Sequence, residues 1–247
     1  MNAWSRMELL LGKAGLTRLQ QSKVAVFGLG GVGSHAAEAL ARAGVGHLII
    51  VDHDTVSVTN INRQLLALTE TVGKLKTAVM EERLRQINPE IKVTAYPLFY
   101  SQETKDTLLR DNYDYVVDAV DTVTAKLDLI KTCRKRRIPL ISSMGTANKL
   151  DPTQLKIGDI SQTKICPLAK IMRKELRRAG ITKGVKVVYS LEPPLKIKMT
   201  ALEELPEGRR SLPGSISFVP GTAGFLLASA VVHDLLADLI PALERRI

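Results

Sequence analysis

An irregular stretch in the first third of the chain contains the side chains best suited to chemistry on a phosphorylated ligand. It reads HDTVSVTNINRQLLALTE, residues 53–70, and includes Asn60, Arg63 and Gln64. Lys76 follows on the next expected helix. Arginine and lysine side chains that meet at one triphosphate neutralise the charge that develops on the α-phosphate and on the departing pyrophosphate. Long irregular connections in compact domains are usually functional, so the stretch indicates phosphoryl or nucleotidyl transfer.

A glycine-rich turn precedes this stretch. It follows the short apolar run VAVF, and its glycines are Gly28, Gly30, Gly31 and Gly33. Glycines let the backbone turn tightly and let phosphates approach the N–H groups at the start of a helix. Asp52 ends the next expected strand, where a carboxylate can accept hydrogen bonds from both ribose hydroxyls. These residues predict a nucleotide ligand but do not by themselves decide between ATP and NAD.

Two further carboxylates follow a later expected strand. Asp118 and Asp121 belong to the sequence DAVD, near the carboxyl end of the segment 113–120. Doubly wound sheets bind their ligands at this edge. Because a carboxylate there can hold Mg²⁺, the sequence predicts a metal ion beside the nucleotide.

The elements that position these residues alternate along the first 150 residues. The sequence predicts strands at 24–28, 47–52, 91–98, 113–120 and 139–145, and helices at 34–43, 71–86, 102–110 and 123–136. This alternation is typical of an α/β fold with a Rossmann-like, doubly wound, mostly parallel sheet and helices on both faces.

The pattern changes after Asp151. A basic amphipathic segment at 164–178 precedes the strand-like KVVYS at 186–190, and a helix of small residues is expected at 222–239. We expect the C-terminal segment 151–247 to extend the same sheet by further strands. The whole chain, 1–247, is then a single compact domain.

Composition limits the class of protein. Hydrophobic residues make up 45% and charged residues 24% of the 247 residues, as in ordinary globular proteins. The longest apolar run, AGFLLASAVV, ends at His233 and is too short for a bilayer span. The N-terminus lacks the pattern of a signal peptide. Two isolated cysteines, Cys133 and Cys166, fit a reducing compartment, so we expect a cytoplasmic protein that does not bind a membrane.

A net charge of +10 indicates a polyanionic partner. Eight lysines and arginines, against one glutamate, lie between Ser161 and Ser190. This basic segment is either a solvated helix or a surface that faces RNA.

These motifs together resemble the ubiquitin-activating-like adenylating enzymes, which convert a carboxylate into an acyl adenylate with ATP and Mg²⁺. The resemblance covers roughly residues 5–145 and is carried by GxGGVGS, VDxDxVxxxNxNRQ, VGxxK and DAVD. It implies that Gly31 and its neighbours line the ATP and that Asp52 holds the ribose. It further implies phosphate contacts from Asn60, Arg63 and Lys76, with Gln64 beside them, and a magnesium role for Asp121.

The same resemblance implies a homodimer. Arg6 matches an N-terminal arginine that reaches into the partner's site, whereas the residues alone would make it a surface arginine.

Longer stretches resemble one branch, the tRNA threonylcarbamoyladenosine dehydratases, along nearly the whole chain. They include RQINPEIKV, DPTQLKIGDISQTKICPLAK and PGSISFVPGTAGFLLAS. This implies ATP-dependent cyclisation of N6-threonylcarbamoyladenosine at position 37, in the anticodon loop of tRNA. A monovalent cation, K⁺ or Na⁺, and a partner protein related to sulfur transfer are also implied, without residues that place them. Cys166 stands where aspartate is expected.

Two other functions stay open. The protein could adenylate the C-terminal glycine of a small ubiquitin-like sulfur carrier, although the zinc-binding CxxC pairs common in those relatives are missing from the sequence. It could also be an NAD-dependent oxidoreductase or a non-catalytic nucleotide-binding module. The charges of Arg63 and Lys76 argue against the oxidoreductase hypothesis, because hydride transfer does not need them.

Overall fold

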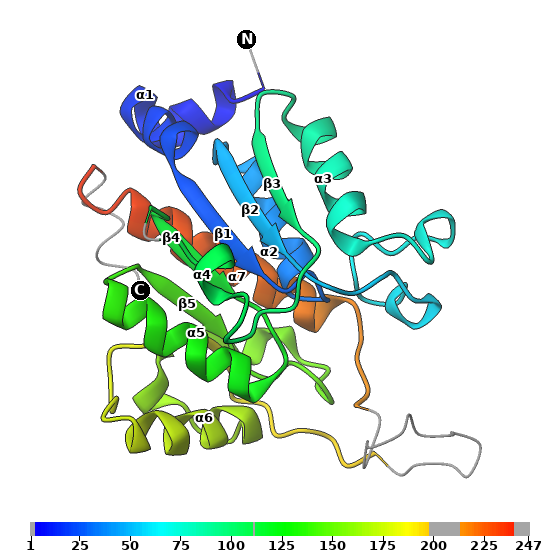
Figure 1. Ribbon diagram of the computed structural model, residues 1–247, viewed down its shortest axis with the longest axis vertical. Coiled ribbons are helices and arrows are strands. Elements are labelled where there is room, and N and C mark those ends of the chain that lie inside the picture. The colour runs from blue at the N-terminus through cyan, green and yellow to red at the C-terminus, as the bar shows by residue number, and fades with distance from the viewer. Residues whose placement is uncertain (1–2, 111, 198–212, 240–247) are drawn as a thin grey trace.

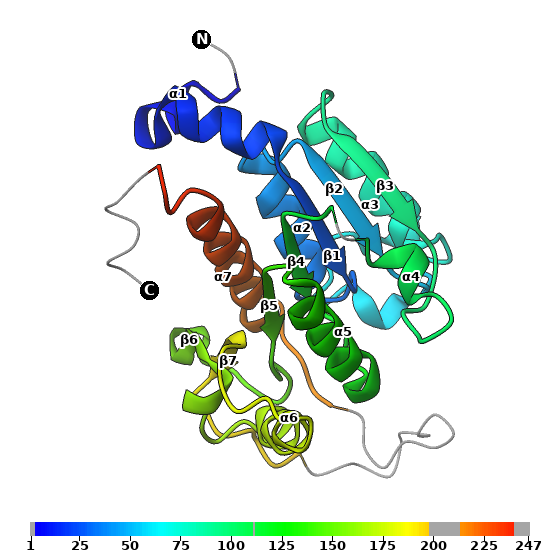
Figure 2. The same cartoon turned by 60° about the vertical axis from the view of Figure 1, so that its left-hand side comes forward.

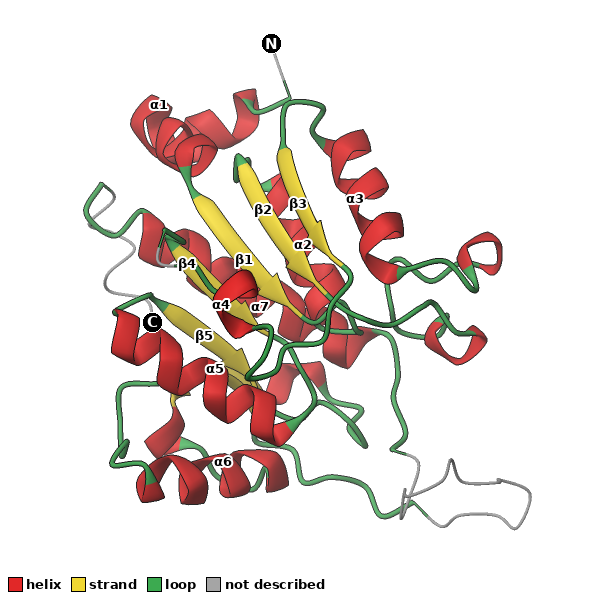
Figure 3. Cartoon of the chain, viewed as in Figure 1, coloured by secondary structure: helices red, strands yellow, loops and turns green. Residues whose placement is uncertain are grey.

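A seven-stranded sheet runs through the computed structural model, which describes residues 3–110, 112–197 and 213–239. Figure 3 shows this sheet with its strands in yellow and the helices around it in red. The strand order is β3-β2-β1-β4-β5-β7-β6. Among the described strands β6 alone is antiparallel to its neighbour. The strands are β1 Lys23–Phe27, β2 His47–Val51, β3 Lys92–Tyr96, β4 Tyr115–Asp118, β5 Leu140–Ser143, β6 Leu155–Asp159 and β7 Lys186–Ser190. The predicted fold class, including C-terminal strands that extend the sheet, is confirmed.

Helices cover both faces of this sheet (Figures 1 and 2). In the described chain they are α1 Ser5–Gln21, α2 Gly33–Arg42, α3 Lys76–Ile87, α4 Lys105–Leu108, α5 Val123–Arg136, α6 Pro167–Arg178 and α7 Phe218–Leu235. Buried side chains of α2, α3 and α7 pack on one face, and those of α4 and α5 pack on the other. The helix α6 packs against α5 and β7.

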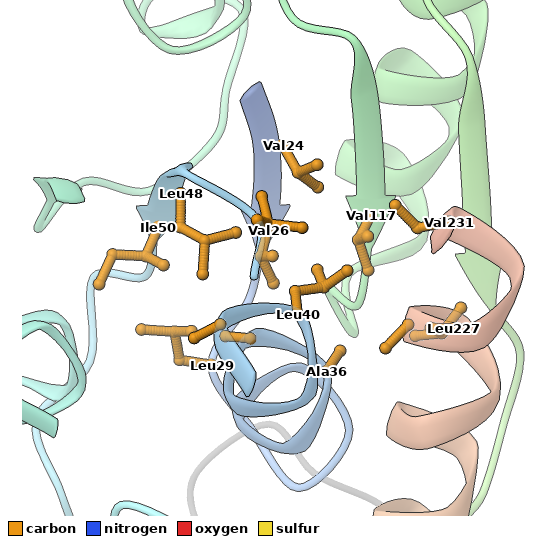
Figure 4. Packing of buried hydrophobic residues seen from close by; sticks show 14 of the residues in the cluster. Val24, Val26, Leu29, Ala36, Leu40, Leu48, Ile50, Val117, Leu227 and Val231 are labelled. Carbon is orange, nitrogen blue, oxygen red and sulfur yellow. The ribbon is translucent and has the colours of Figure 1, made fainter. Parts of the chain in front are cut away.

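The strand β1 shows how the two cores form. Successive side chains of a strand point to opposite faces. Val26 therefore joins Leu40 of α2 and Leu227 of α7 (Figure 4), whereas Phe27 joins Leu129 of α5. Because both faces are covered, the strand is apolar from Val24 to Phe27, as expected for a parallel sheet.

The helix α7 is long and apolar enough to cross a membrane by length and composition. Half of its residues are buried within the molecule. It approaches α2 closely at Gly224, where an added Cβ would lie 2.5 Å from the Val32 carbonyl oxygen. The apolar composition of α7 is therefore accounted for by core packing.

Several predicted boundaries were wrong. The predicted helix 71–86 begins at Lys76, because residues 69–71 form a short 3₁₀ helix and the chain stays extended at Leu75. The predicted helix 222–239 begins at Phe218, because Pro220 lies in the first turn, where proline is tolerated. The helix α1 and the strand β6 were not predicted.

Asn148 joins two distant parts of the chain near the carboxyl end of β5. Its backbone oxygen accepts a hydrogen bond from Leu195 N at 2.7 Å, and its Oδ1 accepts one from Gly214 N at 2.6 Å. Asn62 Nδ2 donates to the Ser215 oxygen at 2.9 Å. The residues on either side of segment 198–212 are thus fixed to one position beside the irregular stretch 53–70.

Candidate active site

A cavity of about 560 Å³ lies where the carboxyl ends of β1, β2 and β4 meet. This volume is in the range of small-molecule sites. Most of the candidate residues line it, namely Gly28, Gly30, Gly31, Asp52, Asn60, Arg63, Gln64, Lys76 and Asp121. Parallel strands bring these residues together because their carboxyl ends share one edge of the sheet.

The glycine turn brings β1 close to the loop after β4. Gly28 has a φ of +89°, and an added Cβ would lie 2.7 Å from the Ala119 oxygen. A Cβ on Gly33 would lie only 1.8 Å from the Gly28 oxygen, so Gly33 closes the turn and is not part of the cavity lining. At Gly30 an added Cβ meets no atom within 4 Å. The turn is therefore tight on its inner side and open where a phosphate would approach.

Gly28→Ala should destabilise the fold more than Gly73→Ala. Both glycines have a positive φ, +89° and +85°, but the space around Gly73 is empty. Strained backbone alone costs roughly 1–3 kcal/mol, which the two variants share, and Gly28→Ala adds the clash with Ala119. Urea unfolding of both variants measures the difference. Equal losses of stability would show that the close approach to Ala119 is unimportant.

Asp52 is held between the glycine turn and the irregular stretch. Its carboxylate accepts hydrogen bonds from Leu29 N at 2.6 Å and from Asp54 N at 2.9 Å. The side chain is buried yet lines the cavity. Two backbone donors thus fix a carboxylate at the end of β2, in the place where a ribose would be recognised.

Lys76 is the first residue of α3 and its side chain is buried. Its Nζ lies 2.6 Å from Asp54 Oδ2 and 3.9 Å from Asp52 Oδ1. A buried ammonium group needs such anionic partners. The cation is therefore fixed at the cavity by acidic groups, and a bound phosphate would be a further anion for it.

Arg63 is partly buried and also lines the cavity. Its Nη1 donates to the Thr59 oxygen at 2.7 Å and to Asn62 Oδ1 at 2.9 Å. An added Cβ on Gly31 would lie 3.3 Å from Arg63 Cγ, so the arginine stem passes directly over the glycine turn. Burial lowers the pKa of Arg63 from its ordinary value, but an arginine of this kind remains charged at neutral pH.

The two amide side chains of the stretch have different surroundings. Asn60 Oδ1 accepts a hydrogen bond from Ser57 N at 3.0 Å, which caps a 3₁₀ turn. Gln64 lines the cavity, and its buried Oε1 has no hydrogen-bond partner among the described residues. Asn60 therefore helps to shape the loop, while Gln64 retains a free acceptor.

The structure separates the two aspartates of DAVD. Asp118 is fully buried, and its Oδ2 lies 2.8 Å from Lys126 Nζ. Asp121 is exposed and lines the cavity, and its Oδ1 accepts a hydrogen bond from the Thr122 hydroxyl at 3.4 Å. Mg²⁺ is usually bound by one or two carboxylates together with substrate phosphates. The carboxylate of Asp121 fits this requirement, whereas that of Asp118 is already neutralised.

Arg6 lies apart from the cavity. It is exposed on α1, the helix that leads into the start of β1, and therefore lies toward the amino ends of the strands (Figure 1). It is not part of the cavity lining. Within one copy of the chain the structure does not bring Arg6 together with the other candidates.

An apolar wall of the cavity was missed in the sequence. His53, Leu98, Phe99 and Tyr100 line it beside Asp52. The rings of His53 and Phe99 meet edge to face, with centroids 4.9 Å apart. Flat apolar walls suit a purine base. The available signal was the run Leu-Phe-Tyr directly after the third strand, at the same sheet edge as Asp52.

Both cysteines are buried away from the cavity lining. Burial raises the pKa of the Cys133 thiol to about 12. A nucleophilic cysteine has to be an accessible thiolate. The described residues that line the cavity therefore offer no thiol for covalent catalysis.

The middle of the basic segment 161–190 is the helix α6, which has one exposed basic face. On α6, Ala169, Met172 and Leu176 are buried, while Lys170 and Lys174 are exposed. Both interpretations of this segment, a solvated helix and an RNA-facing surface, are compatible with that arrangement.

Comparisons with known proteins agree with the nucleotide interpretation. A model described as "ThiF family" matches residues 5–246. The chain is 49% identical over 245 residues to the tRNA threonylcarbamoyladenosine dehydratase of Bacillus subtilis (strain 168), covering 97% of this chain and 96% of that protein. It is 37% identical to the enzyme of the same name from Escherichia coli (strain K12), covering 92% and 91% of the two chains.

Solved structures give the same result. The crystal structure of the E. coli tRNA N6-threonylcarbamoyladenosine dehydratase superposes with a TM-score of 0.85 at 35% identity, covering 96% of this chain and 95% of that one. A complex of that enzyme with ATP matches with a TM-score of 0.85 at 36% identity, covering 96% and 94%.

Proposed function

Since this chain belongs to the ThiF family, we propose that it uses ATP to dehydrate and cyclise N6-threonylcarbamoyladenosine at position 37 of tRNA. The observation that carries the proposal is the convergence of Arg63, Lys76 and Asp121 on one cavity beside the glycine turn. Relatives that match almost the whole chain are dehydratases of this kind, and one of them has been crystallised with ATP.

The reaction consists of an activation and a ring closure. The threonyl carboxylate attacks the α-phosphorus of ATP, the bond to the β-phosphate breaks, and pyrophosphate leaves. The ureido group of the same side chain then attacks the activated carbonyl carbon, AMP leaves, and the ureido group loses a proton. The net change is the removal of one water from the nucleoside. Intramolecular attack has a large effective molarity, so a protein nucleophile is unnecessary.

The cavity residues serve the first step. Arg63 and Lys76 neutralise charge on the phosphates, and Asp52 binds the ribose. Asp121 would hold Mg²⁺, which supplies further positive charge to the phosphates when bound. The described residues offer no basis for placing a K⁺ or Na⁺ ion, which remains part of the proposal without a site.

The tRNA is expected to lie over the basic segment 161–190. Its exposed lysines and arginines suit contacts with the phosphates of an anticodon loop. A cytoplasmic location and a partner protein related to sulfur transfer complete the proposal; both come from the sequence resemblance or composition alone.

A homodimer would bring Arg6 of one subunit to the cavity of the other. In that case, mixing Arg6→Ala and Lys76→Ala proteins should restore activity, because each mixed dimer contains one site with both residues intact. Random exchange of subunits in a twofold dimer gives about a quarter of wild-type AMP release. Each variant alone serves as the control. Failure to restore activity after confirmed subunit exchange would contradict the role of Arg6 in the partner's site.

Incubation with α-labelled ATP and threonylcarbamoylated tRNA tests the function. The proposal expects AMP release together with a mass loss of one water from the nucleoside. A second reaction contains a carrier protein ending in Gly-Gly instead of tRNA. Pyrophosphate exchange with the carrier alone, without dehydration of tRNA, would select the sulfur-carrier alternative.

A further inference from the structure

A fully buried ion pair lies beneath the loop that carries Asp121. Lys126 Nζ on α5 is 2.8 Å from Asp118 Oδ2 at the end of β4, and both side chains have no exposed surface. Ser142 of β5 donates to the same carboxylate oxygen at 2.6 Å. These three residues are not part of the cavity lining, so direct contact with a ligand does not explain why the charged pair is buried here.

The pair closes both ends of the loop 119–122. Asp118 precedes the loop, and its Oδ1 accepts a hydrogen bond from Val120 N at 3.2 Å. Lys126 follows the loop on the first turns of α5, where its backbone N–H donates to the Thr122 oxygen at 3.0 Å. The ammonium–carboxylate contact joins these two ends. The backbone that carries Asp121 is therefore held at its start and at its end, and the ion pair connects these two ends.

The same loop forms part of the nucleotide cavity. Ala119, Val120 and Asp121 all line it, and the Ala119 oxygen lies against Gly28. A shift of the loop would therefore move the Asp121 carboxylate relative to the glycine turn. Paired charges in a dry interior strongly prefer the arrangement that keeps them together.

We propose that Lys126 is a positioning residue which, through Asp118 and Ser142, sets the Asp121 carboxylate at the distance from the phosphate site that Mg²⁺ binding requires. The proposal rests on the proposed function, because Asp121 serves a metal ion only if the cavity binds ATP. Supporting residues around metal ligands commonly change metal affinity by about 10–100-fold when they are replaced.

The test uses the double variant Asp118→Asn/Lys126→Met. Removing both charges avoids a lone buried charge, and replacing a buried ion pair in this way is often tolerated. Calorimetric binding of ATP is measured without Mg²⁺ and during a Mg²⁺ titration, with circular dichroism to confirm folding. We expect Mg²⁺-free ATP affinity within about twofold of wild type and a half-saturating Mg²⁺ concentration raised by about tenfold or more.

A matched control is Asp234→Asn/Lys186→Met. That pair has a 2.6 Å contact, joins α7 to β7 and is not part of the cavity lining. It should lose stability without any change in Mg²⁺ dependence. The single variant Lys126→Arg should retain most of the wild-type Mg²⁺ affinity, because it keeps a positive charge opposite Asp118.

If the double variant does not fold, Ser142→Ala replaces it. This change removes one hydrogen bond to Asp118 and should raise the half-saturating Mg²⁺ concentration by a smaller factor in the same direction. An unchanged Mg²⁺ dependence in the folded variant overturns the positioning role. Wild-type protein that binds MgATP but does not dehydrate tRNA would contradict only the tRNA function, and the Mg²⁺ titration would still decide the role of Lys126.

Discussion

Arg63→Ala protein is expected to show a kcat about a thousandfold below wild type, since removing one preorganised cationic contact from a phosphate transition state costs roughly this much. The side chain is held in place by its hydrogen bonds to the Thr59 oxygen and Asn62 Oδ1. Because charge on the α-phosphate grows only as the bond to pyrophosphate breaks, kcat should fall more than the KM for ATP rises. Steady-state AMP release measures both constants.

Arg85→Ala is the matched control for Arg63. Arg85 is a surface arginine that pairs with Glu81 on α3 at 2.8 Å. It should retain wild-type kcat. An Arg63→Ala enzyme whose kcat stays within about tenfold of wild type would contradict the transition-state role.

Lys76→Ala is expected to lower kcat/KM for ATP by roughly a hundredfold to a thousandfold. The ammonium group is preorganised, because Asp54 at 2.6 Å and Asp52 at 3.9 Å fix it at the cavity. Its positive charge attracts ATP before the reaction as well as during it, so both ATP affinity and kcat should fall. Calorimetric ATP binding and AMP release together separate the two effects.

The fold of Lys76→Ala protein should survive. Asp54 is half exposed and water can solvate it, and Asp52 keeps its two backbone donors. Lys74→Ala, which removes an exposed lysine two residues earlier, is the control and should bind ATP normally. Normal turnover by the folded Lys76→Ala enzyme would show that Lys76 is structural.

Alternation of apolar runs and helical segments was sufficient to predict the central sheet. Each of the runs around Val26, Ile50 and Val117 is buried on both faces, which leaves a continuous apolar signal in the sequence. The strand β6 gives no such signal, because it is an edge strand in which only Leu155 is buried. The helix α1 was missed because Leu9 and Leu10 are exposed and Gly12 interrupts its helical backbone.

The candidate site was predictable in its composition, but the residues alone do not give the division of roles. Taken by themselves, Asp118 and Asp121 are equivalent carboxylates after one strand, and only the family resemblance implies the magnesium role for Asp121. Their difference depends on Lys126, which a helix pattern would normally place in solvent. A signal was present, since Lys126 shares a helical stripe with the buried residues Ile130 and Cys133. Only the packing of α5 on β4 and β5 shows that this lysine has the Asp118 carboxylate as its partner.

The attachment of Leu195 and Gly214 to Asn148 affects how well the chain tolerates changes in length between these two residues. Closing a chain segment costs only about 0.6 kcal/mol more for each doubling of its length. The anchors stay the same whatever number of residues connects them, and Asn62 ties the second anchor to the rim of the nucleotide cavity. Changes in the number of residues between the two anchors therefore cost little loop-closure free energy and leave the rim of the cavity in place.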